Sequence, residues 1–397
     1  MAKLIDITGK SLSGEWGTDD ETGDGIPVLR TTNFTNEGVV NYNDVVTRTI
    51  TKKNIADKFL RKGDIIIEKS GGSDKFPVGR VIYFDGEEKT YLFNNFTGLL
   101  RVKNQDEWYP KYIFYSLYAN YKRGGTRAFE NKTTGLHNLK TDDYVSRYEV
   151  AEIDKTEQIL ICEKLNKLYE IIKLRRQELQ LLDELIKARF VEMFGDMYLN
   201  SKGWSEAKLE SMADVVSGIT KGRKTKSEDL TEVPYMAVSN VKDGYIDWTT
   251  VKTIGATQQE IEQYRLLADD VLMTEGGDPD KVGRGAIIKE PLENCIHQNH
   301  IFRVRLDESV VLPEYFAEYL QHQRSKRYFL GCAKQTTGIA SINMTQLRAL
   351  PVLIPPLSKQ EEFVLFKAQV DKSKVAIQAA LDKSQLLFDS LMQKYFG

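Results

Sequence analysis

The 397-residue sequence has few of the residues that stabilise secreted or metal-bound folds. Its three cysteines, Cys162, Cys295 and Cys332, lie far apart and form no C-x-x-C pair, so neither a disulfide framework nor a zinc knuckle is expected. No apolar run approaches the roughly 18 residues that a membrane span needs, and the first residues lack the profile of a signal peptide. These absences predict a soluble, cytoplasmic protein without membrane contact.

The sequence also lacks net charge. Lys and Arg number 55 against 57 Asp and Glu, a formal charge of -2, so no global positive field indicates a nucleic-acid partner. Any contact with DNA must therefore depend on local basic clusters, and we expect weak DNA affinity for the isolated chain. With 41% hydrophobic residues, the chain can bury the cores of two or more domains.

The second half of the sequence repeats features of the first half in the same order. Ile26-Pro27 corresponds to Val233-Pro234, 207 residues later, and Thr133-Thr134-Gly135 corresponds to Thr336-Thr337-Gly338, 203 residues later. This shared order predicts two copies of one structural unit.

Each copy ends in a stretch of about 40 residues that is nearly free of Gly and Pro and has apolar residues at heptad spacing. Such stretches are typical of long helices that pack along a seam. The predicted seam residues are Ile161, Leu165, Leu168, Ile172, Leu179, Leu182 and Ile186 in the first helix, and Phe363, Phe366, Val370, Ile377, Leu387 and Leu391 in the second.

The predicted fold class is α+β with an internal pseudo-twofold repeat. Two α/β globules, residues 1–152 and 198–356, alternate with two long helices, residues 153–197 and 357–397. We expect the helices to form an antiparallel coiled coil, because a parallel pair would need the second globule to carry the chain back along the whole rod.

Three fragments resemble enzyme or metal motifs only in part. Gly218 to Thr225 has three residues between its glycines and Arg223 after the second, whereas a phosphate-binding loop needs four residues and then lysine. Asp64 with Glu68-Lys69 suggests a metal-dependent nuclease, but adjacent residues of a strand point to opposite faces.

The third fragment contains ligand-type side chains, Cys295, His297 and His300, without a nearby fourth ligand. A strand that carries histidines is the favoured interpretation. No catalytic residue, bound cofactor or metal is therefore expected in this chain.

Local basic clusters occur at equivalent places in both copies. They lead into the Thr-Thr-Gly segments, where hydroxyls and free N–H groups could bind phosphates while the cations supply counter-charge. A third cluster lies at residues 221–226, and its counterpart in the first copy, residues 14–25, is acidic. Because the two globules differ in charge at this edge, they should read different DNA sequences. The candidate DNA-binding residues are Lys122, Arg123, Arg127, Lys132, Thr133, Thr134, Arg223, Lys224, Lys226, Arg324, Lys326, Arg327, Lys334, Thr336 and Thr337.

Taken in order, these features resemble the DNA specificity (S) subunit of type I restriction-modification systems over essentially the whole chain. The resemblance rests on the Ile/Val-Pro strands, the Asp64 and Asp270 strands with their glycine loops, and the Thr-Thr-Gly segments. It also rests on the segment from Leu350 to Gln360, which precedes a long helix. The first copy departs from this pattern because it lacks the double proline.

The resemblance implies two target-recognition domains that read a bipartite, asymmetric DNA target, separated by helices that dock methyltransferase subunits, two of them in the expected complex. Those partners would bind S-adenosylmethionine, flip an adenine out of the duplex and methylate it. Restriction subunits, with ATP and Mg, would join further out. This chain would bind double-stranded DNA and choose the sequence.

Two alternatives remain open. The chain could be a coiled-coil scaffold that binds proteins and no DNA, in which case assembly should be insensitive to salt. It could also be a free-standing nuclease or nucleotide enzyme, which Mg²⁺-dependent cleavage by the purified chain alone would reveal.

Overall fold

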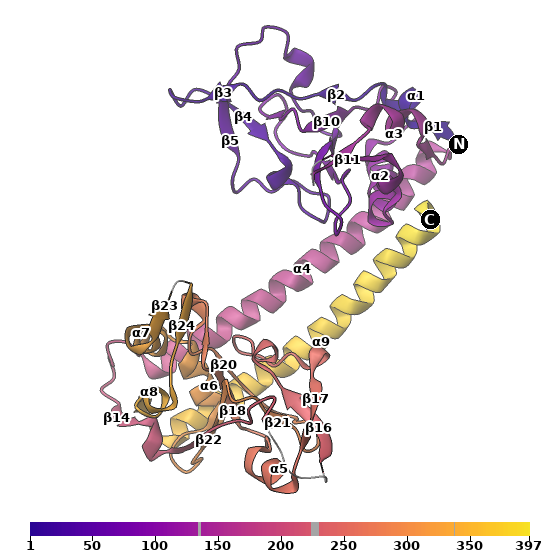
Figure 1. Cartoon of the computed structure of the whole chain (residues 1–397). Coiled ribbons are helices and arrows are strands. Elements are labelled where there is room, and N and C mark those ends of the chain that lie inside the picture. The colour runs from indigo at the N-terminus through magenta and orange to yellow at the C-terminus, as the bar shows by residue number, and fades with distance from the viewer. Residues whose placement is uncertain (134–135, 224–229, 337) are drawn as a thin grey trace. The chain divides into compact units, whose positions relative to one another are not determined.

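The computed structural model describes residues 1–397 except 134–135, 224–229 and 337, and leaves the side chains of residues 132, 133, 280 and 336 undescribed. The chain divides into two compact units (Figure 1). Unit 1 is Met1–Gln177 with Gln378–Gly397, and unit 2 is Glu178–Ile377. The helices α4 (Lys155–Phe194) and α9 (Leu357–Phe396), each 40 residues long, contribute to both units. They lie within the ranges predicted for the long helices.

Unit 1 combines four small sheets with three shorter helices. The helices are α1 (Leu4–Thr8), α2 (Pro110–Lys122) and α3 (Thr141–Arg147). The strands are β1 (Ala2–Lys3), β2 (Leu12–Ser13), β3 (Thr18–Asp19), β4 (Ile26–Leu29), β5 (Val46–Thr49), β6 (Ile65–Glu68), β7 (Ser70–Gly72), β8 (Val81–Tyr83), β9 (Leu92–Phe93), β10 (Thr97–Leu100), β11 (Glu130–Thr133), β12 (Leu136–Leu139) and β13 (Glu149–Val150). Their sheet orders are β1-β13, β2-β10-β6-β8, β11-β12-β7 and β3-β5-β4-β9.

Unit 2 has the same kinds of sheet. Its shorter helices are α5 (Gln258–Tyr264), α6 (Pro313–Gln321), α7 (Gln323–Cys332) and α8 (Met344–Arg348). Its strands are β14 (Ser205–Lys208), β15 (Ala213–Ser217), β16 (Thr231–Met236), β17 (Lys252–Ala256), β18 (Val271–Thr274), β19 (Gly276–Gly277), β20 (Gly285–Ile287), β21 (Ile296–His297), β22 (Ile301–Leu306), β23 (Lys334–Thr336), β24 (Ile339–Ser341) and β25 (Pro351–Ile354). The orders are β14-β25, β15-β22-β18-β20, β17-β16-β21 and β19-β24-β23.

The central strands β6 and β18 are buried along their whole length, so their apolar residues form a continuous run instead of alternating with polar ones. An aspartate precedes each strand. Asp64 accepts two hydrogen bonds from Arg101, both 2.7 Å, and Asp270 accepts two from Arg305, at 2.7 and 2.8 Å. Both carboxylates are buried, so each unit contains a paired charge beside its central strand.

A buried glutamine fixes the start of each long helix. In unit 1, Gln158 Oε1 accepts a hydrogen bond from the Tyr109 N–H at 2.8 Å, beside the first residue of α2. In unit 2, Gln360 Oε1 accepts from the Leu312 N–H, also at 2.8 Å, beside the first residue of α6. Each amide nitrogen donates to two further backbone carbonyls. In each unit, the glutamine side chain of a long helix is thus bound to the backbone directly before a short helix.

Within each unit, α4 and α9 also contact one another. In unit 1, Arg175 donates to the Ala380 carbonyl and to the Ser384 hydroxyl. In unit 2, Arg189 pairs with Glu362 at 2.9 Å. There the rings of Phe190 and Phe363 also meet edge to face, with centroids 5.2 Å apart. Aromatic side chains therefore close the core of unit 2 against both helices.

The seam predicted for the long helices needs one correction. None of the predicted α4 seam residues is exposed, and on α9 the predicted residues Phe363 to Ile377 are also at least half-buried. Leu387, however, is 49% exposed, whereas Phe388 is buried, so the assignment of Leu387 was wrong. A strict heptad assumes 3.5 residues per turn, but an α-helix has about 3.6, so the buried stripe moves to the next residue after several turns.

Candidate nucleic-acid interface

The strands on either side of each Thr-Thr-Gly segment pair with one another. In unit 1 the hairpin β11–β12 continues into β7, and in unit 2 the hairpin β23–β24 continues into β19. Lys334 is exposed on β23. Thr134 and Thr337 lie outside the described residues, as do the side chains of Lys132, Thr133 and Thr336. The strands that flank the two segments thus belong to a three-stranded framework that both units share.

The other cations of the first basic stretch surround the end of α2. Lys122 is exposed, with its ammonium 5.3 Å from the centre of the Tyr118 ring. Arg123 donates to the Phe396 carbonyl at the end of α9. Arg127 donates to two carbonyls of the loop after β7, at 3.3 and 3.4 Å. Arg123 and Arg127 are thus bound to backbone acceptors of unit 1.

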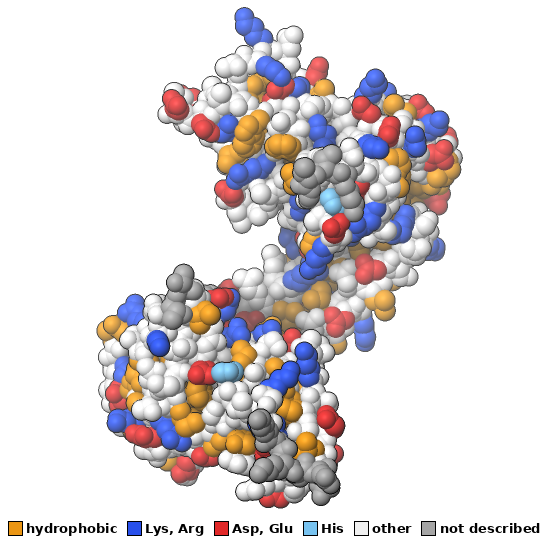
Figure 2. Space-filling view, viewed as in Figure 1, with side chains coloured by type: hydrophobic (Ala, Val, Ile, Leu, Met, Phe, Trp, Pro, Cys, Tyr) orange, Lys and Arg blue, Asp and Glu red, His pale blue; other side chains and the backbone are white. Residues whose placement is uncertain are grey.

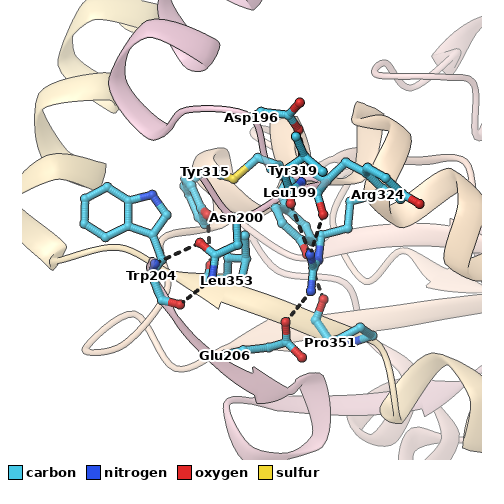
Figure 3. Close-up of polar contacts among 12 residues, drawn as sticks. Asp196, Leu199, Asn200, Trp204, Glu206, Tyr315, Tyr319, Arg324, Pro351 and Leu353 are labelled. Carbon is cyan, nitrogen blue, oxygen red and sulfur yellow. Dashed lines mark hydrogen bonds and ion pairs between the residues drawn. The ribbon is translucent and has the colours of Figure 1, made fainter. Parts of the chain in front are cut away.

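Arg324, in the second basic stretch, is held inside unit 2 (Figure 3). Its guanidinium donates to the carbonyls of Met197 and Tyr198, at 3.1 and 3.2 Å, and pairs with Glu206 on β14. These three acceptors join α7 to the segment between α4 and β14. The side chain is only 19% exposed, so its contacts are those of a structural anchor.

The next two cations of α7 lie closer to solvent. Lys326 forms an ion pair with Asp243 at 3.4 Å, and the two side chains are 41% and 52% exposed. Arg327 is exposed and lies over the Tyr198 ring, 4.4 Å from its centre. On the face drawn in Figure 2, basic and acidic side chains are interspersed over each unit, which agrees with the balanced composition.

The cluster at residues 221–226 is only partly described, because Lys224 and Lys226 lie outside the described residues. Arg223 makes two hydrogen bonds of 2.6 Å to Glu260 on α5, and this contact lowers the pKa of Glu260 to about 2. Gly218 is required by a close contact, since an added Cβ would lie 1.9 Å from the His297 carbonyl oxygen. The glycine thus allows close strand packing at this position.

The other enzyme-like fragments also have structural partners. Asp64 is paired with Arg101, and Glu68 with Arg80 at 3.2 Å. Cys295 is buried, and His297 Nδ1 lies 3.0 Å from the Ile301 carbonyl. Among the described residues, no group of three or more His, Cys, Asp or Glu side chains could hold a metal ion.

Sequence reasoning missed one pair of positions at the base of the hairpins, because through-space contacts define them. In unit 1, the Lys69 N–H donates to the Phe96 carbonyl at 2.8 Å. In unit 2, the Glu275 N–H donates to the His300 carbonyl at 3.0 Å. The same backbone contact therefore presents different side chains in the two units.

Both long helices expose apolar residues away from their contact with each other. On α4 several of these side chains follow one another at helical spacing, whereas on α9 they are farther apart. They are Leu160, Ile171, Leu174, Leu181, Leu185 and Val191 on α4, and Leu365, Val375, Leu386 and Leu387 on α9. Among the described residues, no helix is long and apolar enough to cross a membrane.

Comparisons with known proteins agree with this geometry. Residues 201–384 match the family model described as the type I restriction modification DNA specificity domain. The chain is 24% identical over 399 residues to the EcoKI specificity subunit of Escherichia coli, covering 94% of this chain and 82% of that protein. This chain resembles type I specificity subunits over nearly its whole length. The resemblance predicted from the sequence is thus confirmed.

Other relatives and solved structures agree. A putative MjaX specificity subunit of Methanocaldococcus jannaschii is 25% identical over 195 residues, covering 49% of this chain and 45% of that protein. The fold resembles that of the type I S subunit from M. genitalium, with a TM-score of 0.58 and 16% identity, covering 100% and 95% of the two chains. The curated relatives from Escherichia coli and Salmonella potsdam are both named specificity subunits of type I restriction enzymes.

Proposed function

We propose that this chain is the DNA specificity subunit of a type I restriction-modification complex, with each unit reading one half of a bipartite, asymmetric target. The observation that carries the proposal is a shared framework with different surfaces. Each unit has a buried aspartate paired with an arginine, a buried glutamine at the start of a long helix, and a three-stranded sheet that contains a hairpin. The side chains at equivalent positions of this framework differ between the units. We attribute the framework to an internal duplication with pseudo-twofold symmetry. The complex would act on host DNA in the cytoplasm.

DNA contact would depend on local cations, since the chain has no net positive charge. We assign phosphate contacts to the hairpins and to the exposed cations Lys122, Lys326, Arg327 and Lys334. Arg123, Arg127, Arg223 and Arg324 donate to protein acceptors, so we assign them a positioning role. Lys132, Lys224, Lys226 and the threonines 133, 134, 336 and 337 remain candidates on sequence grounds.

The long helices would form an antiparallel coiled coil that sets the distance between half-sites. The pairings within unit 2 support this direction, because Asp183 pairs with Lys374 whereas the later Arg189 pairs with the earlier Glu362. A helix of 40 residues is about 60 Å long, which is enough to span half-sites one or more turns of DNA apart, each turn being about 34 Å.

The exposed apolar residues of α4 and α9 would dock two methyltransferase subunits. Apolar patches on a helix surface are typical of protein interfaces. S-adenosylmethionine would bind to those partners, and restriction subunits with ATP and Mg would join the complex. Replacing Leu181 and Leu185 by Asp should prevent co-purification with the methyltransferase while leaving the circular dichroism spectrum unchanged. Retained assembly would show that the docking surface lies elsewhere.

The test of DNA specificity is a comparison of host DNA methylation with and without the gene. We expect one bipartite motif to lose its methylation when the gene is absent, and the complex to bind a duplex carrying that motif less tightly as salt increases. Unchanged methylation, with assembly of the partners intact and no shift of any duplex, would favour the protein-scaffold alternative.

A further inference from the structure

The positions of Lys69 and Glu275 are equivalent by their backbone contacts. Each residue directly follows the central strand of its unit. The Lys69 carbonyl accepts from the Leu139 N–H at 2.9 Å, and the Glu275 carbonyl accepts from the Ile342 N–H at 2.8 Å. Leu139 is the last residue of β12, and Ile342 directly follows β24. Each of these strands comes directly after the Thr-Thr-Gly segment of its unit. Each residue therefore lies at the base of the hairpin to which phosphate contacts are assigned.

In unit 1 this position offers hydrogen-bond donors. The Lys69 ammonium donates to the Ser13 hydroxyl at 3.0 Å and forms no ion pair with a described residue. Two of its three N–H groups have no hydrogen-bond acceptor among the described residues, although the side chain is half-buried and burial lowers its pKa. Phe96, whose carbonyl accepts from the Lys69 N–H, is 54% exposed. Unit 1 thus presents a donor at this position.

In unit 2 the same position offers an acceptor. Glu275 Oε2 lies 2.5 Å from His300 Nδ1, which fixes the direction of the carboxylate. The other oxygen, Oε1, has no hydrogen-bond partner within the described part of the chain. The Glu275 side chain is 33% exposed and that of His300 is 56% exposed. A carboxylate held by one oxygen and open at the other can accept a hydrogen bond from a ligand.

We propose that Lys69 and Glu275 are base-reading residues, with Lys69 donating to a guanine in one half-site and Glu275 accepting from a cytosine amino group in the other. This inference rests on the proposed function. In the major groove, guanine presents two acceptors, O6 and N7, whereas cytosine presents the N4 amino donor. The free donors of Lys69 match the first edge, and the free Oε1 of Glu275 matches the second. His300, which contacts the other oxygen of Glu275, borders the second of these contacts and limits the bases that fit.

The experiment uses the assembled complex and measures host methylation together with binding to duplexes substituted at every position of the motif. For Lys69→Gln we expect relaxed discrimination at one G·C pair of one half-site, by about 5-fold to 100-fold. For Glu275→Gln we expect the same at one G·C pair of the other half-site. An amide keeps the size of each side chain, so the folding risk is small.

The controls remove charge elsewhere in the same units. Lys3→Gln, on β1, and Glu308→Gln, before α6, should leave the motif unchanged. The inference is overturned if the Lys69 and Glu275 variants keep the wild-type motif, if they weaken binding equally for every duplex, or if both alter the same half-site. If the wild-type complex shows no bipartite motif, the proposed function itself fails, which is a separate outcome.

Discussion

Units 1 and 2 differ most inside their shared framework, where equivalent positions carry side chains of different polarity. Glu68, at the end of β6, is buried and paired with Arg80, whereas Thr274, at the end of β18, is buried with a hydroxyl that has no described partner. Burial raises the pKa of Glu68. The comparison teaches that strand order and backbone contacts define this fold, while individual buried polar groups can change between the units.

The same holds at the ends of β9 and β21. Phe93 and His297 are both fully buried, and the carbonyl of each accepts a hydrogen bond of 2.8 Å, from the N–H groups of Glu15 and Ile219. One ring is apolar and the other can be protonated. The two units should therefore respond differently to acid, although they share an architecture.

The largest effect is expected from removing the buried aspartate–arginine pair that both units contain. Replacing Asp64 or Asp270 by Asn breaks a buried ion pair, and we expect each change to destabilise its own unit by about 3 kcal/mol, because an uncompensated guanidinium remains. Hydrogen exchange resolved along the chain should show loss of protection in β6 for Asp64→Asn and in β18 for Asp270→Asn. Asp57→Asn, at an exposed ion pair, is the control and should change little. Equal loss in both units would mean that they unfold together.

The second test concerns acid. Burial lowers the pKa of His297 to about 4, so the folded state stays neutral at this site while the unfolded state takes up a proton below its ordinary pKa of 6.5. Stability from this group is complete above pH 6.5 and is lost as pH falls toward 4. We expect a loss of about 2 kcal/mol between pH 7 and pH 5.

The matched variant is His297→Phe, which introduces the side chain found in unit 1. Urea unfolding at pH 7 and pH 5, followed in unit 2, should show that this variant lacks the histidine contribution to acid sensitivity. If wild type and variant lose the same stability over this range, His297 is not the responsible group.

The third test separates a structural cation from a surface cation within α7. Arg324→Met removes the donor to three acceptors, and we expect a loss of about 1.5 kcal/mol in the stability of unit 2. Arg327→Met should leave stability within about 0.5 kcal/mol and weaken DNA binding by the assembled complex. Thermal unfolding and a duplex-binding titration measure the two effects. Identical behaviour of the two variants would contradict the assignment.

The smallest effect is expected at Lys326. Its ion pair with Asp243 is exposed, so Lys326→Met should cost less than about 0.5 kcal/mol of stability. If Lys326 contacts a phosphate, the plot of log binding constant against log salt concentration should become shallower by about one in the Lys326→Met variant. An unchanged slope would remove Lys326 from the DNA-contact set.

Much of the architecture followed from the sequence, because heptad spacing and a repeated order of strands are local signals. The predicted seam residues from Ile161 to Ile186 and from Phe363 to Ile377 are not exposed, whereas Leu387 is 49% exposed because the helical repeat departs from the heptad. Charge clusters were a poorer guide to the site. The acceptors that hold Arg123 and Arg324 are backbone carbonyls far along the chain, and nothing in the local sequence reveals them.

The buried glutamines have a consequence for inheritance. Gln158 and Gln360 contact backbone atoms of the segment directly before the adjoining short helix. These hydrogen bonds do not depend on which side chains that segment carries. Genetic recombination at these joints would therefore keep the glutamine contacts, although a new globule would still have to pack against aromatic residues such as Phe190. On the proposed function, such an exchange would give a lineage a new DNA target in a single event.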